Sequence, residues 1–319
     1  MKAVLRFVGF LLLLIVVAGL VFYTNPLWVS DNVLRFKLWR QGVKSEYVDA
    51  GGYSFHYFEA KPAQGTGMPL LLVHGLGARS EEWAKMIPAM AELGYHVYAL
   101  DLPGYGRSSK PEDADYTITM EEAAVVTFMQ AVHLQHADVG GWSMGGWIVM
   151  KLALDHPQMV DRLAVYDSAG VYFPANFGSE LFLPTDAAGV ERLLHALSPL
   201  QRGMPDFVVR DVLRKIALGG WVVSRSMASM FDGRELLDFK LHDIRQPTLV
   251  MWGAADRLIP LDAGRRIHAG IPNSVLAVVQ GCGHLTPSEC AVPVIEETDA
   301  FFKAQPPMQG GEKTYPAPF

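Results

Sequence analysis

Gly141-Trp142-Ser143-Met144-Gly145 is the most informative stretch of this sequence, because it joins a short apolar run to a helical pattern. Ala137–Gly140 precede it, and Gly146–Leu154 follow it with apolar residues at helical spacing. In a tight turn from strand to helix the serine is lifted clear of the sheet, and glycines are needed where neighbouring backbone leaves no room for a side chain. Ser143 would also lie at a helix N-terminus, whose free N–H groups favour a developing anion. The stretch predicts a serine nucleophile; alone, it also fits a glycine-rich connection with an incidental serine.

Strand and helix patterns alternate on both sides of this stretch, from Glu46 onward. Most of the later strands are continuous apolar runs, which is typical of parallel strands covered on both faces. We expect helices at Glu81–Leu93 and from about Met120 to Leu134, the second with Thr119 and Glu122 as a capping box. The alternation predicts an α/β fold with a doubly wound, mostly parallel sheet and right-handed crossovers. The predicted strands are Tyr53–Phe58, Leu70–Val73, His96–Leu100, Ala137–Gly141, Leu163–Asp167, Thr248–Trp252 and Val275–Val279.

The alternation breaks between about residues 171 and 245, where the pattern is mostly helical. We interpret this segment as a helical cap inserted between two strands. Trp221, Met227 and Met230 would suit an adaptable apolar wall of a lid over the active site. The alternative is a satellite helical layer that closes the core. Residues 304–319 are rich in proline and glycine, which predicts a flexible tail.

A serine nucleophile needs a base, and the base needs an acid that orients it. Asp256 follows the apolar strand that ends at Trp252, and His284 follows the last predicted strand, in Gly281-Cys282-Gly283-His284. The carboxyl ends of parallel strands share one edge of the sheet, so Ser143, Asp256 and His284 are the predicted catalytic residues. Asp167, at the end of another strand, is the alternative acid, although we favour Asp256. His284 could instead be an ordinary loop histidine.

An oxyanion hole requires two backbone N–H groups that point at the developing negative charge. Met144, directly after the nucleophile, is predicted to supply one. Leu76, in the loop His74-Gly75-Leu76-Gly77 after a strand, is predicted to supply the other, with Gly77 as the alternative. His74 is expected to hold this loop by hydrogen bonds rather than to act as a base.

The N-terminus has the pattern of a membrane segment. Phe7–Tyr23 is uncharged and follows Lys2 and Arg6, so residues 1–24 predict a single-pass transmembrane anchor; a signal peptide cleaved near residue 18 is the alternative. Residues 25–45 alternate tryptophan and aliphatic residues with basic ones, which predicts an amphipathic helix in the headgroup layer, or a helix packed on the body. Residues 1–44 hold six basic residues and one acidic residue, against 21 and 32 in the remainder. This division argues against nucleic-acid binding. The side of the membrane stays open, because basic residues flank both sides of the anchor.

From Glu46 to Lys303 the sequence resembles an α/β-hydrolase. The resemblance is carried by His74–Gly77, Asp101–Ser108, Gly141–Gly145, Asp256 and His284, which follow the family's order. It implies that 46–303 is the hydrolase domain and that Asp101–Ser108 is a structural turn. The anchor and the basic segment before this domain resemble the membrane-anchored monoacylglycerol lipase branch. That branch implies hydrolysis of acylglycerol esters without a cofactor.

Metal and redox chemistry have no candidate residues in the sequence. No His or Cys spacing indicates a metal site, and no glycine-rich nucleotide loop is complete. The two cysteines, Cys282 and Cys290, could form a bridge, but we expect two small buried thiols.

The leading hypothesis is therefore a membrane-anchored serine carboxylesterase or lipase that acts on monoacylglycerols or similar fatty esters. A C–C bond or amide hydrolase that uses the same triad is the alternative within enzymes. A C–C bond hydrolase would need cations to bind a substrate carboxylate. The cap contains five arginines that could supply them: Arg192, Arg202, Arg210, Arg214 and Arg225. A non-catalytic binding protein with a hydrolase fold is the third possibility.

Overall fold

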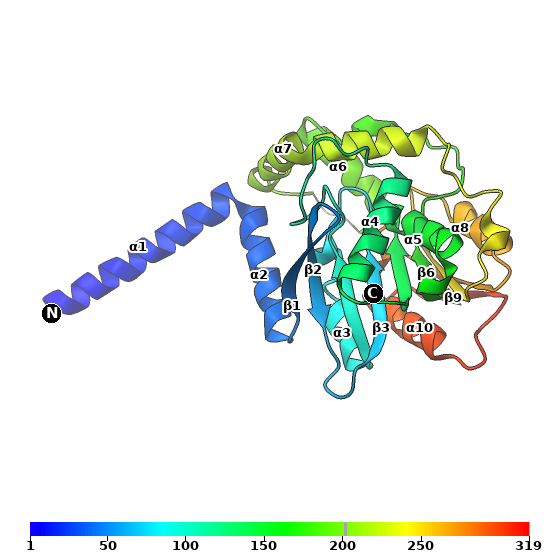
Figure 1. Ribbon diagram of the computed structural model, residues 1–319. Coiled ribbons are helices and arrows are strands. Elements are labelled where there is room, and N and C mark those ends of the chain that lie inside the picture. Colours follow the sequence, from blue (N-terminus) through cyan, green and yellow to red (C-terminus); the bar gives the residue numbers. More distant parts are fainter. Residues whose placement is uncertain (201–202, 319) are drawn as a thin grey trace.

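The computed structural model describes residues 1–200 and 203–318, and these contain one nine-stranded sheet (Figure 1). The strand order is β1-β2-β4-β3-β5-β6-β7-β8-β9; β2 is antiparallel to both of its neighbours and all other pairs are parallel. The seven predicted strands are all present, and β1 and β9 are additional. The bounds are β1 Lys44–Ala50, β2 Tyr53–Ala60, β3 Met68–Val73, β4 Tyr95–Leu100, β5 Ala137–Trp142, β6 Val160–Tyr166, β7 Thr248–Gly253, β8 Ser274–Val279 and β9 Glu312–Tyr315.

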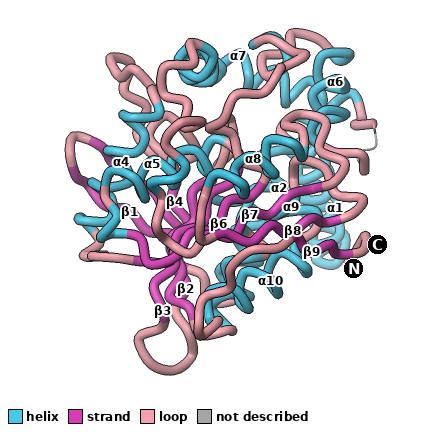
Figure 2. The backbone as a smooth tube through the Cα atoms, turned by 90° about the vertical axis from the view of Figure 1, so that its right-hand side faces the viewer, coloured by secondary structure: helices cyan, strands magenta, loops and turns pink. Residues whose placement is uncertain are grey.

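Helices cover both faces of the sheet, as the apolar strand runs predict (Figure 2). On one face α4 (Ile118–Ala131), α5 (Met144–Asp155) and α8 (Leu261–Gly270) pack on the sheet in one hydrophobic core. On the other face α3 (Met86–Glu92) and α10 (Ala291–Lys303) build a second core. Strands β5, β7 and β8 are buried along their whole length, so the loops at their carboxyl ends start from fixed positions.

The cap region between β6 and β7 contains α6 (Ala187–Leu197) and the long α7 (Asp206–Phe231), which lie across the top of the body in Figure 1. Short helical segments complete the chain: η1 Ser80–Trp83, η2 Pro157–Met159, η3 Ser179–Leu181, η4 Leu241–Asp243 and α9 Thr286–Glu289. The helix predicted at Glu81–Leu93 is thus divided into η1 and α3.

The N-terminal helix α1 (Lys2–Thr24) projects away from the body, and α2 (Pro26–Arg40) turns back along the edge of the body (Figure 1). Within the described residues α1 is the one helix long and apolar enough to cross a membrane; its mean hydropathy is 2.8 and none of its residues is buried. One side of α2 packs on the body, with Leu38 buried and Asp31 paired to Arg79 at 2.5 Å. The other side leaves Trp28, Val33, Phe36 and Trp39 exposed. The packed side agrees with the interpretation of residues 25–45 as a helix that packs on the body, and a position in the headgroup layer stays a prediction for the exposed side.

Two local predictions were wrong. Helix α4 begins two residues earlier than the capping box of Thr119 and Glu122 requires: Thr117 is the N-cap, and its hydroxyl accepts from the Met120 N–H at 3.0 Å. Residues 304–319, predicted to be a flexible tail, contain the strand β9. This strand forms because the free backbone groups at the edge of β8 pair with it, and the sequence of the tail does not show that pairing. Lys313, on this strand, also pairs with Glu297 at 2.8 Å.

Candidate active site

Ser143 lies in the turn between β5 and α5. Its backbone conformation (φ 56°, ψ −118°) is one that residues other than glycine rarely adopt. The adjoining glycines are required by close packing: a Cβ on Gly141 would lie 2.3 Å from the Gly145 carbonyl oxygen, and one on Gly145 would lie 2.3 Å from the Val73 carbonyl oxygen. The elbow therefore presses against the end of β3. This packing holds a strained residue in place, as is common for nucleophiles.

A hydrogen-bonded chain joins the three predicted catalytic residues. The Ser143 hydroxyl oxygen lies 2.9 Å from His284 Nε2, and His284 Nδ1 lies 2.8 Å from Asp256 Oδ2. The other carboxylate oxygen of Asp256 accepts from the N–H groups of Leu258 and Ile259, at 2.8 and 3.0 Å. Asp256 is thereby fixed with one oxygen directed at the imidazole, a geometry that can hold a proton on Nδ1 and leave Nε2 free to accept one.

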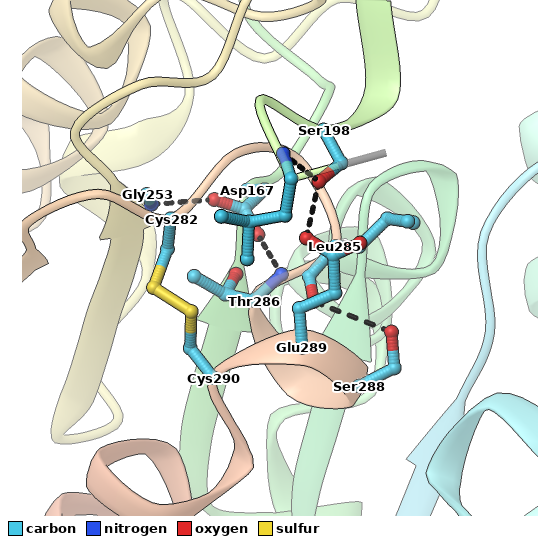
Figure 3. The surroundings of a disulfide bond; sticks show 10 residues. Asp167, Ser198, Gly253, Cys282, Leu285, Thr286, Ser288, Glu289 and Cys290 are labelled. Carbon is cyan, nitrogen blue, oxygen red and sulfur yellow. Dashed lines mark hydrogen bonds between the residues drawn. A yellow bond between two sulfur atoms is a disulfide. The ribbon is translucent and has the colours of Figure 1, made fainter. Parts of the chain in front are cut away.

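Asp167, the alternative acid, is bound elsewhere. Its two carboxylate oxygens accept from the N–H groups of Gly253 at 2.8 Å and Thr286 at 3.3 Å (Figure 3). It thus links the ends of β6 and β7 to the first residue of α9. Burial, followed by the nearby Asp256, raises the pKa of Asp167 well above its usual range, which favours a neutral carboxyl.

Leu76 and Met144 are the two residues predicted to supply the oxyanion hole. Leu76 lines the same cavity as Ser143, and Met144 is the first residue of α5, whose N–H has no acceptor within the helix. In the part of the chain that the structure describes, the Leu76 N–H also has no hydrogen-bond acceptor.

His74 has a structural role, as predicted from the sequence. Its Nδ1 donates to the Gly75 carbonyl at 2.8 Å, and its Nε2 accepts from the Leu102 N–H at 3.1 Å, so both of its nitrogens hold the loop. Burial lowers the pKa of His74, consistent with a neutral imidazole.

The two cysteines form a disulfide bond, and the expectation of free thiols was wrong (Figure 3). Their Cα atoms are 6.4 Å apart, because α9 folds the chain back after His284. The bond closes a short loop that carries His284. The same loop is bound to the cap: the His284 N–H donates to the Leu197 carbonyl at 2.7 Å, and the Ser198 hydroxyl donates to Glu289 at 2.5 Å. In the sequence, the only sign of this disulfide is that the two cysteines lie on either side of His284. Their spacing does not show that α9 brings the two cysteines together.

We expect the double substitution Cys282→Ala/Cys290→Ala to lower kcat about tenfold or more, because a displacement of His284 by a fraction of an ångström weakens its contact with Ser143. Loss of a loop closure of this length should also lower the free energy of unfolding by about 2–3 kcal/mol. Steady-state kinetics and urea unfolding measure the two effects. A reductant should slow the native protein and leave the double variant unaffected; an unchanged kcat in the variant would contradict a role for the bond in positioning His284.

An apolar cavity of about 280 Å³ opens at Ser143 beneath the cap. No charged side chain lines it among the described residues. The aromatic residues of the loop after β6 were not anticipated from the sequence, because that segment has no regular pattern. The principal lining side chains are Leu76, Trp147, Phe173, Phe177, Phe182, Met227, Met230, Phe231 and Leu236.

The cap arginines serve other contacts. Arg210 bonds to the Tyr23 hydroxyl at 3.0 Å, and Arg214 to Asp211 and Asn25. Arg225 bonds to the Glu112 carbonyl and stacks on Trp221. Arg192 is exposed, and Arg202 lies outside the described residues. No described cap arginine lines the cavity at Ser143.

A doubly wound sheet with a Ser–His–Asp chain at its carboxyl edge defines the class of α/β-hydrolases, and comparison with known proteins agrees. Residues 68–195 match the model of the alpha/beta hydrolase fold. A 2-hydroxymuconate semialdehyde hydrolase of Pseudomonas putida is 32% identical over 243 residues, which cover 72% of this chain and 84% of the relative. The enzyme of the same name from Pseudomonas sp. strain CF600 is 31% identical over 71% of this chain and 84% of its own. The chain belongs to the α/β-hydrolase fold family.

Among solved structures, a membrane phospholipase A, described as a bacterial virulence factor, matches with a TM-score of 0.79. It is 27% identical, and the match covers 95% of this chain and 98% of that one. The match covers a larger share of this chain than the 71% and 72% that the muconate hydrolase relatives cover.

Proposed function

We propose that this protein is a membrane-anchored serine ester hydrolase that cleaves monoacylglycerols or similar fatty acyl esters through an acyl-enzyme on Ser143. The observation that carries this proposal is the uncharged, aromatic-rich cavity that opens at the Ser143 hydroxyl. An acyl chain gains free energy by leaving water for such a wall. The likeness to a membrane phospholipase A, which covers 95% of this chain, supports a lipid substrate.

The mechanism follows from the hydrogen-bonded chain. His284 Nε2 accepts the Ser143 proton as the hydroxyl oxygen attacks the ester carbonyl, and Asp256 stabilises the imidazolium that forms. The N–H groups of Leu76 and Met144 bind the oxyanion of the tetrahedral intermediate. His284 then gives its proton to the departing alcohol. Water, activated by the same histidine, hydrolyses the acyl-enzyme and releases the fatty acid.

Anchorage by α1 is part of the proposal. The helix continues from its apolar stretch into Tyr23, which stacks on Phe207 of the cap at 5.4 Å between ring centroids. A substrate dissolved in the bilayer would therefore meet the cap near the end of the anchor (Figure 1). The Cys282–Cys290 disulfide supports a body on the oxidising side of the membrane, since reducing compartments disfavour such bonds.

A C–C bond hydrolase is the second candidate, since the relatives at 31% and 32% identity are 2-hydroxymuconate semialdehyde hydrolases. The acid substrate that such chemistry implies carries a carboxylate. Burying that charge in a cavity whose described lining has no cation would be costly. The lining therefore favours an ester with an uncharged acyl group.

The test is a substrate panel: p-nitrophenyl esters of two to sixteen carbons, long-chain monoacylglycerols and one dienone acid, all with the full-length protein. We expect kcat/KM to rise with acyl length and to be negligible for the dienone acid. Cleavage of the dienone acid faster than every ester would refute the proposal in favour of the second candidate.

Met230→Trp should narrow the cavity and shift the chain-length preference. Met230 lies on the cap helix and lines the cavity, so a bulkier ring there competes with the distal carbons of a long acyl chain. We expect kcat/KM for long esters to fall about 10- to 100-fold, with acetate esters little affected. Met230→Leu, of similar volume, is the matched control. An equal loss for short and long esters would place the acyl chain elsewhere.

A further inference from the structure

A second hollow, far from Ser143 in sequence and lined by none of the residues of the catalytic cavity, lies between α2 and the start of α3. It is open, with a volume of about 620 Å³. Leu34 and Leu38 of α2 and Ala84 and Pro88 near α3 form its apolar floor. Its rim carries three cations, Lys37, Arg40 and Lys85. We call this hollow the basic groove.

The charge of the basic groove is uncompensated. In the described ranges, 1–200 and 203–318, Lys37, Arg40 and Lys85 have no ion pair or side-chain hydrogen bond, and no acidic residue lines the groove. Arg35, on the same helix, is by contrast paired with Glu81 at 3.9 Å. Arg35 is thus paired with an acid of the body, while the three cations of the groove remain available to an anion.

The position of the groove indicates where that anion comes from. Helix α2 follows the apolar α1 directly and runs along the edge of the body from which α1 departs (Figure 1). Beside the groove, Phe36 and Trp39 are 56% and 67% exposed, with their ring centroids 5.7 Å apart. Exposed aromatic rings among basic side chains are typical of surfaces that lie at the headgroup layer of a bilayer.

We infer that the basic groove binds the phosphate-bearing headgroup of an anionic lipid in the bilayer. Lys37, Arg40 and Lys85 would contact the phosphate, and the half-buried Leu34 the first carbons below it. Attraction to anionic headgroups grows with each basic residue close to the membrane. The inference rests on the membrane location in the proposed function and is independent of ester hydrolysis at Ser143.

The test uses full-length protein in detergent micelles, with native mass spectrometry after addition of phosphatidylglycerol or phosphatidylcholine. We expect a one-to-one phosphatidylglycerol adduct that is favoured over the phosphatidylcholine adduct. Lys37→Gln/Arg40→Gln/Lys85→Gln should weaken it by about fivefold per removed charge. The matched control is Arg234→Gln/Lys240→Gln/Arg245→Gln, which removes three surface cations elsewhere and should retain the adduct.

The other measurements test whether the basic groove is the lipid site. Equal adducts with both lipids, or a full adduct in the groove variant, would overturn it. Displacement of the lipid by millimolar inorganic phosphate would also overturn it, since the groove would then be a site for free anions. Ser143→Ala should bind phosphatidylglycerol normally, so that loss of hydrolysis and loss of lipid binding are distinguished. An unchanged melting temperature of the groove variant shows that it is folded.

Discussion

Ser143→Ala is expected to lower kcat for ester hydrolysis by about a millionfold, to the rate that binding and oxyanion stabilisation alone sustain. The Ser143 hydroxyl is the nucleophile in the proposed mechanism, and at 2.9 Å from His284 Nε2 it is the group this base can activate. An alanine leaves no atom to form the acyl-enzyme. Initial rates with p-nitrophenyl butyrate measure the loss, and a fluorophosphonate probe should label the native protein and leave the variant unlabelled.

The matched control is Ser224→Ala, on the exposed side of the cap helix, which should keep full activity and full labelling. Circular dichroism would show that both variants are folded. Full activity of Ser143→Ala would contradict the mechanism. Failure of the folded native protein to react with the probe would instead support a binding protein with a hydrolase fold.

Asp256→Asn is expected to lower kcat by about a thousand- to ten-thousandfold with little change in KM. The Leu258 and Ile259 N–H groups would hold the amide oxygen, so the amide nitrogen would turn toward His284 Nδ1. That nitrogen donates a hydrogen bond, which places the imidazole proton on Nε2. His284 would then be unable to accept the Ser143 proton. Steady-state kinetics on a soluble ester measure the effect.

Asp167→Asn is the matched comparison, and we expect less than about a tenfold loss of kcat. The amide oxygen can still accept from the Gly253 N–H, and Asp167 has no hydrogen bond to His284. A larger loss in Asp167→Asn than in Asp256→Asn would reverse the assignment of the acid.

The free energy of unfolding should depend on pH differently in the native protein and in Asp167→Asn. Burial raises the pKa of Asp167 above 3.8, its ordinary value, so above that pH the folded protein keeps a proton that the unfolded chain has released. Stability from this group is therefore greatest at low pH and falls as the pH rises toward the folded-state pKa. Asp167→Asn should remove this fall, which urea unfolding at a series of pH values would detect. An identical pH dependence in both proteins would contradict a raised pKa.

Much of the fold could be predicted because its signals are local. The buried parallel strands have continuous apolar runs, and the elbow at Ser143 contains its own glycines, so the positions of these strands and of the cap insertion follow from short windows. The edge strands β1 and β9 were missed, since an edge strand is stabilised by its neighbour's free backbone groups rather than by its own hydrophobic pattern. The start of α4 was misplaced for a related reason: Glu235, distant in sequence, accepts from the Ile118 and Thr119 N–H groups.

The sequence by itself determined the α/β class, the serine at the elbow and the candidate residues His284 and Asp256 at strand ends, because each depends on residues adjacent in the chain. Only the tertiary structure decided that Asp256 reaches the imidazole while Asp167 binds Gly253 and Thr286. It also decided that the cysteines are bonded and that the described cap arginines do not line the cavity. Those outcomes depend on where loops from distant parts of the chain meet, and the packing of the whole sheet and cap sets those positions.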